Sequence, residues 1–218
     1  METAGMIVVL LGSPGVGKGT QGVRLSRTLG WDHVSTGDLL RAALRQGTEL
    51  GLEARKYMNA GELVPDGVIV DLVHEHLDGL DPGRGVIFDG FPRTVAQAEA
   101  LDEVLAAAGR AVNLVALLEA DDAILFKRIS GRRSSPSGRV YNVYFDPPRR
   151  DGFCDDTGEP LIHRADDFPD TVRTRLAVYR KSTAPLVGYY DTGGLLVRVD
   201  GGGGIDKVQA ALRAAVGV

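Results

Sequence analysis

The sequence predicts an α/β fold in which a five-stranded parallel sheet lies between two layers of helices. Short apolar runs rich in β-branched residues alternate with segments of helical periodicity, which is typical of repeated βαβ units. The first run, residues 6–11, is apolar throughout, as a central strand covered on both faces should be. The crossovers between successive strands should be right-handed.

The remaining elements follow in order along the chain. Further strands are predicted at residues 33–35, 85–89, 113–119 and 195–199. Helices are predicted at residues 18–30, 35–47, 48–61, 65–78, 94–108, 121–130 and 205–216.

Capping and turn residues support these boundaries. Gly30 is typical of the position just after a helix, and Ser35 with Asp38 fits a capping box that opens the next one. Thr48 can cap the following helix, and Pro65 suits the first turn of the helix after that.

Length and composition limit the possible functions. The 218 residues suffice for one α/β domain with an insertion, and the net charge of −4 argues against nucleic acid as a partner. The single cysteine, Cys154, excludes an internal disulfide and a four-cysteine zinc site within one chain. Residues 1–5 are too short and polar for a signal peptide, and no apolar run approaches transmembrane length. We therefore expect a cytoplasmic protein without a membrane partner.

Residues 131–167 interrupt the regular pattern. They are rich in Gly, Pro, Ser and Asp and have no helical period, so a disordered insertion is one interpretation. Five aromatic residues favour instead a small folded flap with its own core, which could close as a lid: Tyr141, Tyr144, Phe145, Phe153 and Phe168.

A glycine-rich segment, residues 12–18 (GSPGVGK), follows the first strand directly and leads into a helix. Glycines allow backbone N–H groups to turn inward around a phosphate, and the helix N-terminus adds its positive dipole end. Lys18 supplies a mobile charge that can follow a phosphoryl group. This context disfavours a simple turn without a ligand and predicts a P-loop that binds a nucleoside triphosphate for phosphoryl transfer.

The residue after the lysine bears on metal binding. The strict pattern has Ser or Thr there, whereas this chain has Gly19 and places the hydroxyl one residue later, at Thr20. We therefore expect Mg²⁺ to be held by the nucleotide and by water. Asp89, at the end of a predicted strand, could bind one of those waters, although a solvated turn aspartate is the alternative.

A series of short motifs runs in order from about residue 6 to residue 201. They are residues 12–20 (GSPGVGKGT), 35–38 (STGD), 89–94 (DGFPRT) with Gln97, 131–133 (GRR), 137–141 (SGRVY), 146–148 (DPP), 164–167 (RADD), 183–186 (TAPL) and 199–201 (VDG). Together they resemble adenylate kinase, a nucleoside-monophosphate kinase, in its long-lid bacterial form.

The resemblance implies a reaction and an organisation. The reaction is ATP + AMP ⇌ 2 ADP with Mg²⁺, so ATP, AMP and ADP are the expected partners. Residues 1–218 would form a single, monomeric P-loop kinase domain with a small helical AMP-binding insertion at residues 35–64 and a β-rich lid at residues 131–168. Closure of both mobile parts would exclude water from the reaction.

The resemblance also implies site residues. Catalytic roles fall to Lys18, Arg93, Arg128, Arg132, Arg164 and Arg175. ATP would bind at Gly15, Val16, Gly17, Lys18, Gly19, Thr20, Arg128, Arg132, Val140, Tyr141 and Gly203. AMP would bind at Thr36, Arg41, Glu62, Leu63, Val64, Gly90, Phe91, Pro92, Arg93, Gln97, Arg164 and Arg175.

These residue types suit two polyanions that must meet end to end. The planar arginine fork binds phosphate oxygens bidentately and keeps its charge. For Arg128 and Arg175 taken alone, a solvated helix surface is an equal alternative. The amide of Gln97 can both donate to and accept from the adenine edge. Asp166 and Asp167 match acidic residues that help the lid to close.

Three alternatives remain open. Another monophosphate such as UMP, CMP or GMP could be the acceptor, because base preference depends on few contacts. A nucleotide-dependent switch would not need the second arginine set at Arg41 and Arg93. A degenerate regulatory homologue would be expected to lack part of the motif set, and no part is missing.

The lid departs from the zinc-binding members of the family, which carry paired cysteines. Here Ser134 to Ser137 replaces the first pair, Cys154 stands at the third position and Thr157 at the fourth. We also expect Cys154 to be inert, because its neighbours Asp155 and Asp156 are acidic.

We therefore predict that the purified protein contains no zinc. Elemental analysis by mass spectrometry should find less than about 0.1 zinc per chain, since a tetrahedral site needs four ligands. A stoichiometric metal that survives dialysis against a chelator would contradict this prediction.

Overall fold

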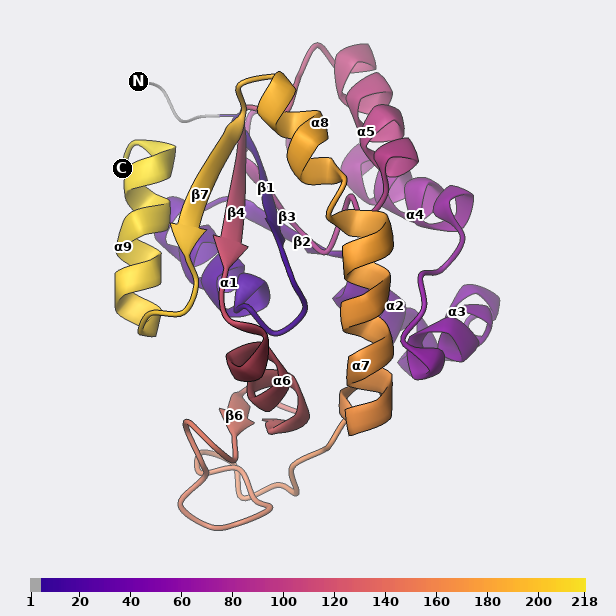
Figure 1. Ribbon diagram of the computed structural model, residues 1–218. Helices are drawn as coiled ribbons and strands as arrows, with labels where there is room; N and C mark the ends of the chain where they lie inside the picture. Colours follow the sequence, from indigo (N-terminus) through magenta and orange to yellow (C-terminus); the bar gives the residue numbers. More distant parts are fainter. Residues whose placement is uncertain (1–4) are drawn as a thin grey trace.

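The computed structural model describes residues 5–218 and contains the five-stranded parallel sheet that the sequence predicts (Figure 1). The strand order is β2-β3-β1-β4-β7, and every neighbouring pair is parallel. Residues 1–4 lie outside the described residues. They belong to the segment for which the sequence predicts no signal peptide. The strands are β1 (Ile7–Gly12), β2 (Asp32–Ser35), β3 (Val86–Asp89), β4 (Leu114–Glu119) and β7 (Leu196–Asp200).

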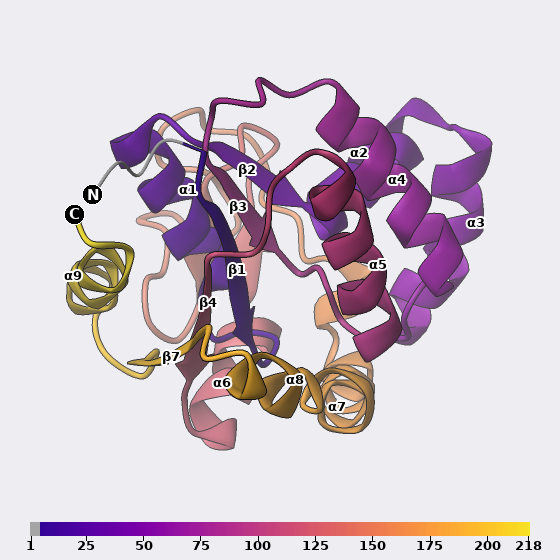
Figure 2. The same ribbon diagram turned by 90° about the horizontal axis from the view of Figure 1, so that it is seen from above.

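Helices cover both faces of the sheet, as Figure 2 shows from above. One face carries α1 (Lys18–Leu29) and α9 (Ile205–Val216); the other carries α4 (Asp66–Asp78), α5 (Val95–Ala107), α7 (Pro169–Val178) and α8 (Leu186–Thr192). The alternation of side chains along β1 explains its continuous apolar run. Val8 and Leu10 belong to one apolar cluster, and Ile7 and Val9 to the other. Within residues 5–218, no helix has the length and apolar character needed to cross a membrane.

The capping predictions are confirmed at the helical insertion, residues 35–64. The hydroxyl of Ser35 accepts from the Asp38 N–H and opens α2 (Thr36–Gln46), and Thr48 caps α3 (Glu49–Ala60). Gly30 and Gly61 end their helices in the left-handed conformation, with φ values of 70° and 75°.

Two details of the capping predictions are wrong. The Asp38 side chain pairs with Arg41 at 2.7 Å, and within residues 5–218 no hydrogen bond from the Ser35 N–H to this carboxylate completes the capping box. Pro65 lies just before α4, which begins at Asp66. Its missing N–H is tolerated there because the first N–H groups of a helix have no intrahelical partner.

Residues 169–192, for which the sequence predicts no element, form three consecutive helical segments. These are α7, a π-helical turn at Tyr179–Thr183, and α8. Each α-helix buries a single i, i+4 pair, Val172 with Leu176 and Leu186 with Tyr190. So narrow an apolar stripe gives little periodicity in the sequence.

The lid segment, residues 131–168, follows α6 (Asp122–Ser130) and lies beyond the carboxyl ends of the sheet strands (Figure 1). It contains a short antiparallel pair, β5 (Arg132–Ser134) with β6 (Val140–Asn142), and a 3-10 turn at Ala165–Asp167. Its backbone also forms isolated bridges, including Ser134 with Ile162. The folded flap that the aromatic residues favoured is therefore present.

The aromatic core expected for this segment is wrong in part. Tyr144, Phe145 and Phe168 are 59%, 54% and 50% exposed, because so small a hairpin cannot bury them all. Tyr141 alone is fully buried. Its hydroxyl accepts from the Asp155 N–H at 2.8 Å, so hydrogen bonds carry much of the cohesion.

Close packing of α2 on α3 shapes the helical insertion. A Cβ atom on Gly51 would lie 2.3 Å from the backbone of Ala43 and Leu44, so no larger residue fits at this crossing. Glycine at position 51 therefore fixes the separation of the two helices.

We predict that Gly51→Ala lowers the free energy of unfolding by about 2 kcal/mol or more, because the methyl group would force the two helices apart. Urea unfolding followed by circular dichroism measures this change. The control is Gly67→Ala on the exposed first turn of α4, where a Cβ meets nothing within 4 Å. It should stabilise by about 0.5 kcal/mol. Equal stability of the two variants would contradict the prediction.

Candidate functional site

The loop between β1 and α1 lies at the carboxyl end of the central strand. A Cβ on Gly12 would lie 2.4 Å from the Leu118 carbonyl oxygen, and one on Gly15 would lie 2.5 Å from the Ile129 side chain. Gly12, Gly15 and Gly17 all have positive φ values. This backbone path is therefore available only to glycine at these positions, and it leads directly into the N-terminus of α1.

Lys18 turns back over this loop. Its ammonium donates to the carbonyl oxygens of Gly12 at 2.7 Å and Ser13 at 3.1 Å. Burial lowers the pKa of Lys18 to about 8, although the nearby carboxylate of Asp89 opposes the shift. The protein therefore holds a partly desolvated cation at the loop, ready to pair with an anion.

Five arginines from separate parts of the chain form one electrostatically coupled cluster, in which Arg93, Arg132 and Arg175 act directly on Lys18. They are Arg41 on α2, Arg93 after β3, Arg132 on β5, Arg164 before the 3-10 turn and Arg175 on α7. Burial, and then neighbouring arginines, lower the pKa of Arg93 to about 10, and the same causes act on Arg164. The arginines repel one another, and this repulsion adds to the cost of burying their charges. A cluster of buried cations of this kind is typical of a site that binds an anion.

Two adjacent aspartates offset part of this charge. Asp167 is fully buried and accepts two hydrogen bonds from Arg132, at 2.8 and 2.6 Å. Arg175 donates to Asp166 and Asp167, both at 3.1 Å. The pair therefore fixes two guanidinium groups in place.

Arg128 stands apart from this cluster. Its guanidinium donates to the carbonyl oxygens of Gly201 at 2.7 Å and Val16 at 3.3 Å. It thereby connects the glycine-rich loop to the turn after β7, near Gly203. Arg128 is thus engaged with backbone rather than freely solvated.

A second group of predicted residues surrounds the turn after β3. The Thr36 hydroxyl and the Arg93 Nε both donate to the Gly90 carbonyl oxygen, at 2.9 and 2.7 Å. The Arg93 N–H donates to the Gln97 Oε1 at 2.7 Å. Phe91 and Val64 are buried beside this turn, whereas Glu62 is exposed.

Two contacts here were missed from the sequence. The Thr183 hydroxyl donates to the Arg93 carbonyl oxygen at 2.8 Å, and Asp66 accepts from the Gln97 side chain at 2.7 Å. Thr183 lies in the quoted TAPL motif, which was the available signal for it.

Comparison of the sequence with known proteins identifies its family. The family model described as Adenylate kinase matches residues 10–195. The chain belongs to the adenylate kinase family. A curated adenylate kinase from Chloroherpeton thalassium is 49% identical over 206 residues, covering 94% of each chain. Those from Bacillus subtilis, 46% identical over 97% of this chain and 98% of the relative, and Methanothrix thermoacetophila, 43% identical over 93% and 94%, are similarly related.

In this adenylate kinase family member, the predicted lid residues differ in accessibility. Tyr141 is 2% exposed and lies inside the lid segment, whereas its neighbour Val140 is 45% exposed. Arg139 lies over the Tyr141 ring, 4.8 Å from its centroid. The ring is therefore already covered on at least one side by protein.

Cys154 has more polar surroundings than the sequence indicated. Hydrogen bonds from Ser135, Thr157 and Tyr141 lower the pKa of the Cys154 thiol to about 6. The side chain is nevertheless buried, which limits its access to reagents.

Asp89 has the chemistry expected of a residue that holds magnesium through water. Its carboxylate lies at the end of β3, is 13% exposed and lies 3.7 Å from His33 Nε2. A Cβ on Gly19 would lie 3.2 Å from Asp89 Oδ2, so glycine keeps the space beside this oxygen clear. Such hard oxygen donors fit Mg²⁺ that retains its water ligands. Among residues 5–218, no three His, Cys, Asp or Glu side chains form a candidate metal cluster.

We predict that Lys18→Met stabilises the fold while removing activity. Below pH 8 the folded protein carries the cost of a buried charge, and this cost disappears between pH 8 and the ordinary lysine value of 10.5. The thermal midpoint of Lys18→Met should therefore exceed that of the wild type at pH 7, and the difference should shrink from pH 8 to 10.5. A lower midpoint for the variant at pH 7 would contradict this prediction.

Proposed function

We propose that this protein catalyses the reversible transfer of the terminal phosphoryl group of Mg·ATP to AMP, giving two ADP. The observation that supports this most directly is that two groups of cations lie next to each other. The first set is centred on Lys18 at the glycine-rich loop, and the second set is centred on Arg41 and Arg93. Lys18 at the glycine-rich loop lies within the electrostatic reach of Arg93, which in turn is influenced by Arg41 and Arg175. A site for a single triphosphate has no need of the second set.

We assign the triphosphate to the first set and the monophosphate to the second. ATP would bind at residues 15–20, with Arg128, Arg132, Val140, Tyr141 and Gly203 around it. AMP would bind at Thr36, Arg41, residues 62–64, residues 90–93 and Gln97, with Arg164 and Arg175 towards the transferred group. The helical insertion and the lid segment would be the parts that close over the two nucleotides.

The chemistry then needs no protein nucleophile. An AMP phosphate oxygen forms the new bond to the γ-phosphorus as the bond to the β-phosphate oxygen breaks. Arg93, Arg132 and Arg175 are suited to neutralise the equatorial oxygens because their forks are already held by protein partners. Bound Mg²⁺ would add charge neutralisation on the phosphates. Exclusion of water would favour transfer over hydrolysis.

We further propose that the protein acts as a monomer in the cytoplasm without a nucleic-acid partner. The net charge of −4 and the family resemblance support this. Size-exclusion chromatography with light scattering at micromolar concentration tests the oligomeric state.

The proposal predicts that ADP formation from Mg·ATP depends strictly on AMP, as a coupled spectrophotometric assay can show. Arg93→Ala should lower kcat by about a thousandfold, since a desolvated arginine at the transferred phosphate contributes that much. Arg213→Ala, an exposed arginine on α9, is the matched control and should retain wild-type turnover.

Each of three outcomes would contradict the assignment. ADP formation indifferent to AMP would indicate hydrolysis, and a strong preference for GMP, CMP or UMP would indicate another acceptor. Near-normal turnover in Arg93→Ala would mean that the second set is misassigned.

A further inference from the structure

We infer that Asp66 determines the base selectivity of the acceptor site by fixing the orientation of the Gln97 side-chain amide. This inference rests on the proposed function, because it assumes that Gln97 faces the base of the monophosphate. Asp66 matches none of the quoted motifs and acts here as a positioning residue.

Both carboxylate oxygens of Asp66 are occupied by partners at the start of α5. Oδ1 accepts from Gln97 Nε2 at 2.7 Å, and Oδ2 accepts from the Thr94 hydroxyl at 3.0 Å. Thr94 in turn accepts from the backbone N–H of Gln97 at 3.1 Å. Gln97 is therefore held through its backbone and its side chain at once.

The other end of the amide has an equally definite partner. Gln97 Oε1 accepts from the Arg93 N–H at 2.7 Å. A reversed amide would place Oε1 against the Asp66 carboxylate and Nε2 against the Arg93 N–H. Because both contacts would become repulsive, Gln97 has a single stable orientation.

That orientation decides which base edge can pair. Gln97 is 1% exposed, so a base reaches it only after the atoms that cover it move. Beyond its contacts with Asp66 and Arg93, its side chain then offers one N–H on Nε2 and one lone pair on Oε1. Adenine offers an acceptor at N1 and a donor at its exocyclic amine, which these groups complement. Guanine offers a donor and an acceptor in the reverse order, so it would require the reversed amide.

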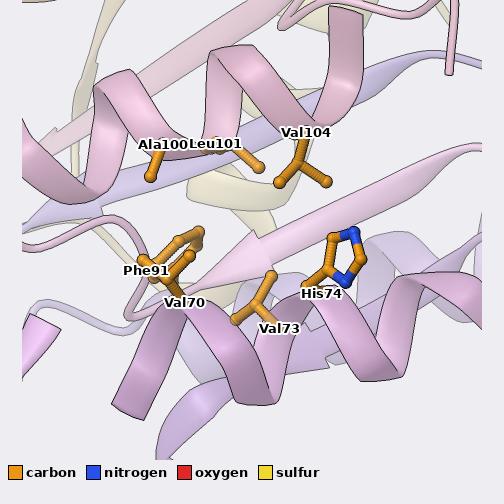
Figure 3. A pocket seen from close by; sticks show the side chains of 7 residues that line it. All are labelled: Val70, Val73, His74, Phe91, Ala100, Leu101 and Val104. Atoms are coloured by element: carbon orange, nitrogen blue, oxygen red, sulfur yellow. The ribbon is translucent and has the colours of Figure 1, made fainter. Parts of the chain in front are cut away.

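Packing of α4 on α5 keeps Asp66 in reach of Gln97. Figure 3 shows side chains from the two helices facing each other across a narrow apolar crevice, with Phe91 at one end. The crevice is too narrow to admit water, so α4 and α5 are in direct side-chain contact along it. Its lining residues are Val70, Val73, His74, Phe91, Ala100, Leu101 and Val104.

A purely structural role for Asp66 is the competing explanation. An acidic residue in the first turn of a helix stabilises it through the macrodipole. Loss of that stabilisation would affect every acceptor alike, whereas release of the Gln97 amide would change the ratio between acceptors. The ratio of kcat/KM values for AMP and GMP therefore separates the two explanations.

The test uses Asp66→Asn, which keeps the side-chain shape but can face either orientation of Gln97. We expect the AMP/GMP ratio of kcat/KM to fall about tenfold or more, since one correctly oriented amide pair contributes that much discrimination. The KM for AMP should rise while the KM for ATP stays unchanged. Asp71→Asn removes the same charge from an exposed position on the same helix and should keep the wild-type ratio.

An unchanged ratio in a folded Asp66→Asn protein would overturn the inference. Should that variant not fold, the wild-type protein supplies an independent measurement. The side-chain NH₂ signals of Gln97, assigned by their loss in Gln97→Ala, should show slow exchange with solvent; rapid exchange would overturn the inference too. Failure of the wild type to use AMP would instead reject the proposed function.

Discussion

The structure depends on gathering several cations into a space from which much of the water has been removed. Without an anion this arrangement is unfavourable, as the lowered pKa values of Lys18, Arg93 and Arg164 show. It persists because Asp166 and Asp167 satisfy two of the guanidinium groups and because the sheet and helices around it are well packed. The protein thus holds an unfavourable charge arrangement that a phosphate ligand, as we propose, would relieve.

The parallel sheet makes this gathering possible. The carboxyl ends of its parallel strands lie on the same side of the sheet. The loop after β1 and the turn after β3 are therefore close in space although they are distant in sequence. α7 and the lid segment then supply Arg175, Arg132 and Arg164 from above that edge. The cations thus come from several different elements that meet at the carboxyl ends of the strands.

The lid segment is held together differently from the core. Its residues Tyr141, Cys154 and Ser135 form polar contacts, while most of its aromatic rings remain exposed. So little buried apolar surface predicts low local stability for this segment, which agrees with our proposal that it closes over bound nucleotide. By contrast, the turn after β3 and the start of α5 are ordered by short hydrogen bonds around Gln97 and Asp66.

The sequence by itself determined the strand order along the chain, most helix boundaries and the chemical class of the site. These features depend on local signals: apolar runs, capping residues such as Ser35 and Thr48, and glycines at positions where the backbone conformation excludes other residues. It did not predict α7 and α8, because each buries only one pair of apolar residues. It also overestimated how many lid aromatics could be buried.

Only the tertiary structure decided which charges share a site and which polar groups orient them. The contacts of Asp167 with Arg132 and of Asp66 with Gln97 join residues more than thirty positions apart. No periodicity or local motif specifies such pairs, because their geometry results from how helices and loops pack on the sheet. The physical reason is that hydrogen bonds and ion pairs depend on distance in space, which the local pattern of a sequence does not record.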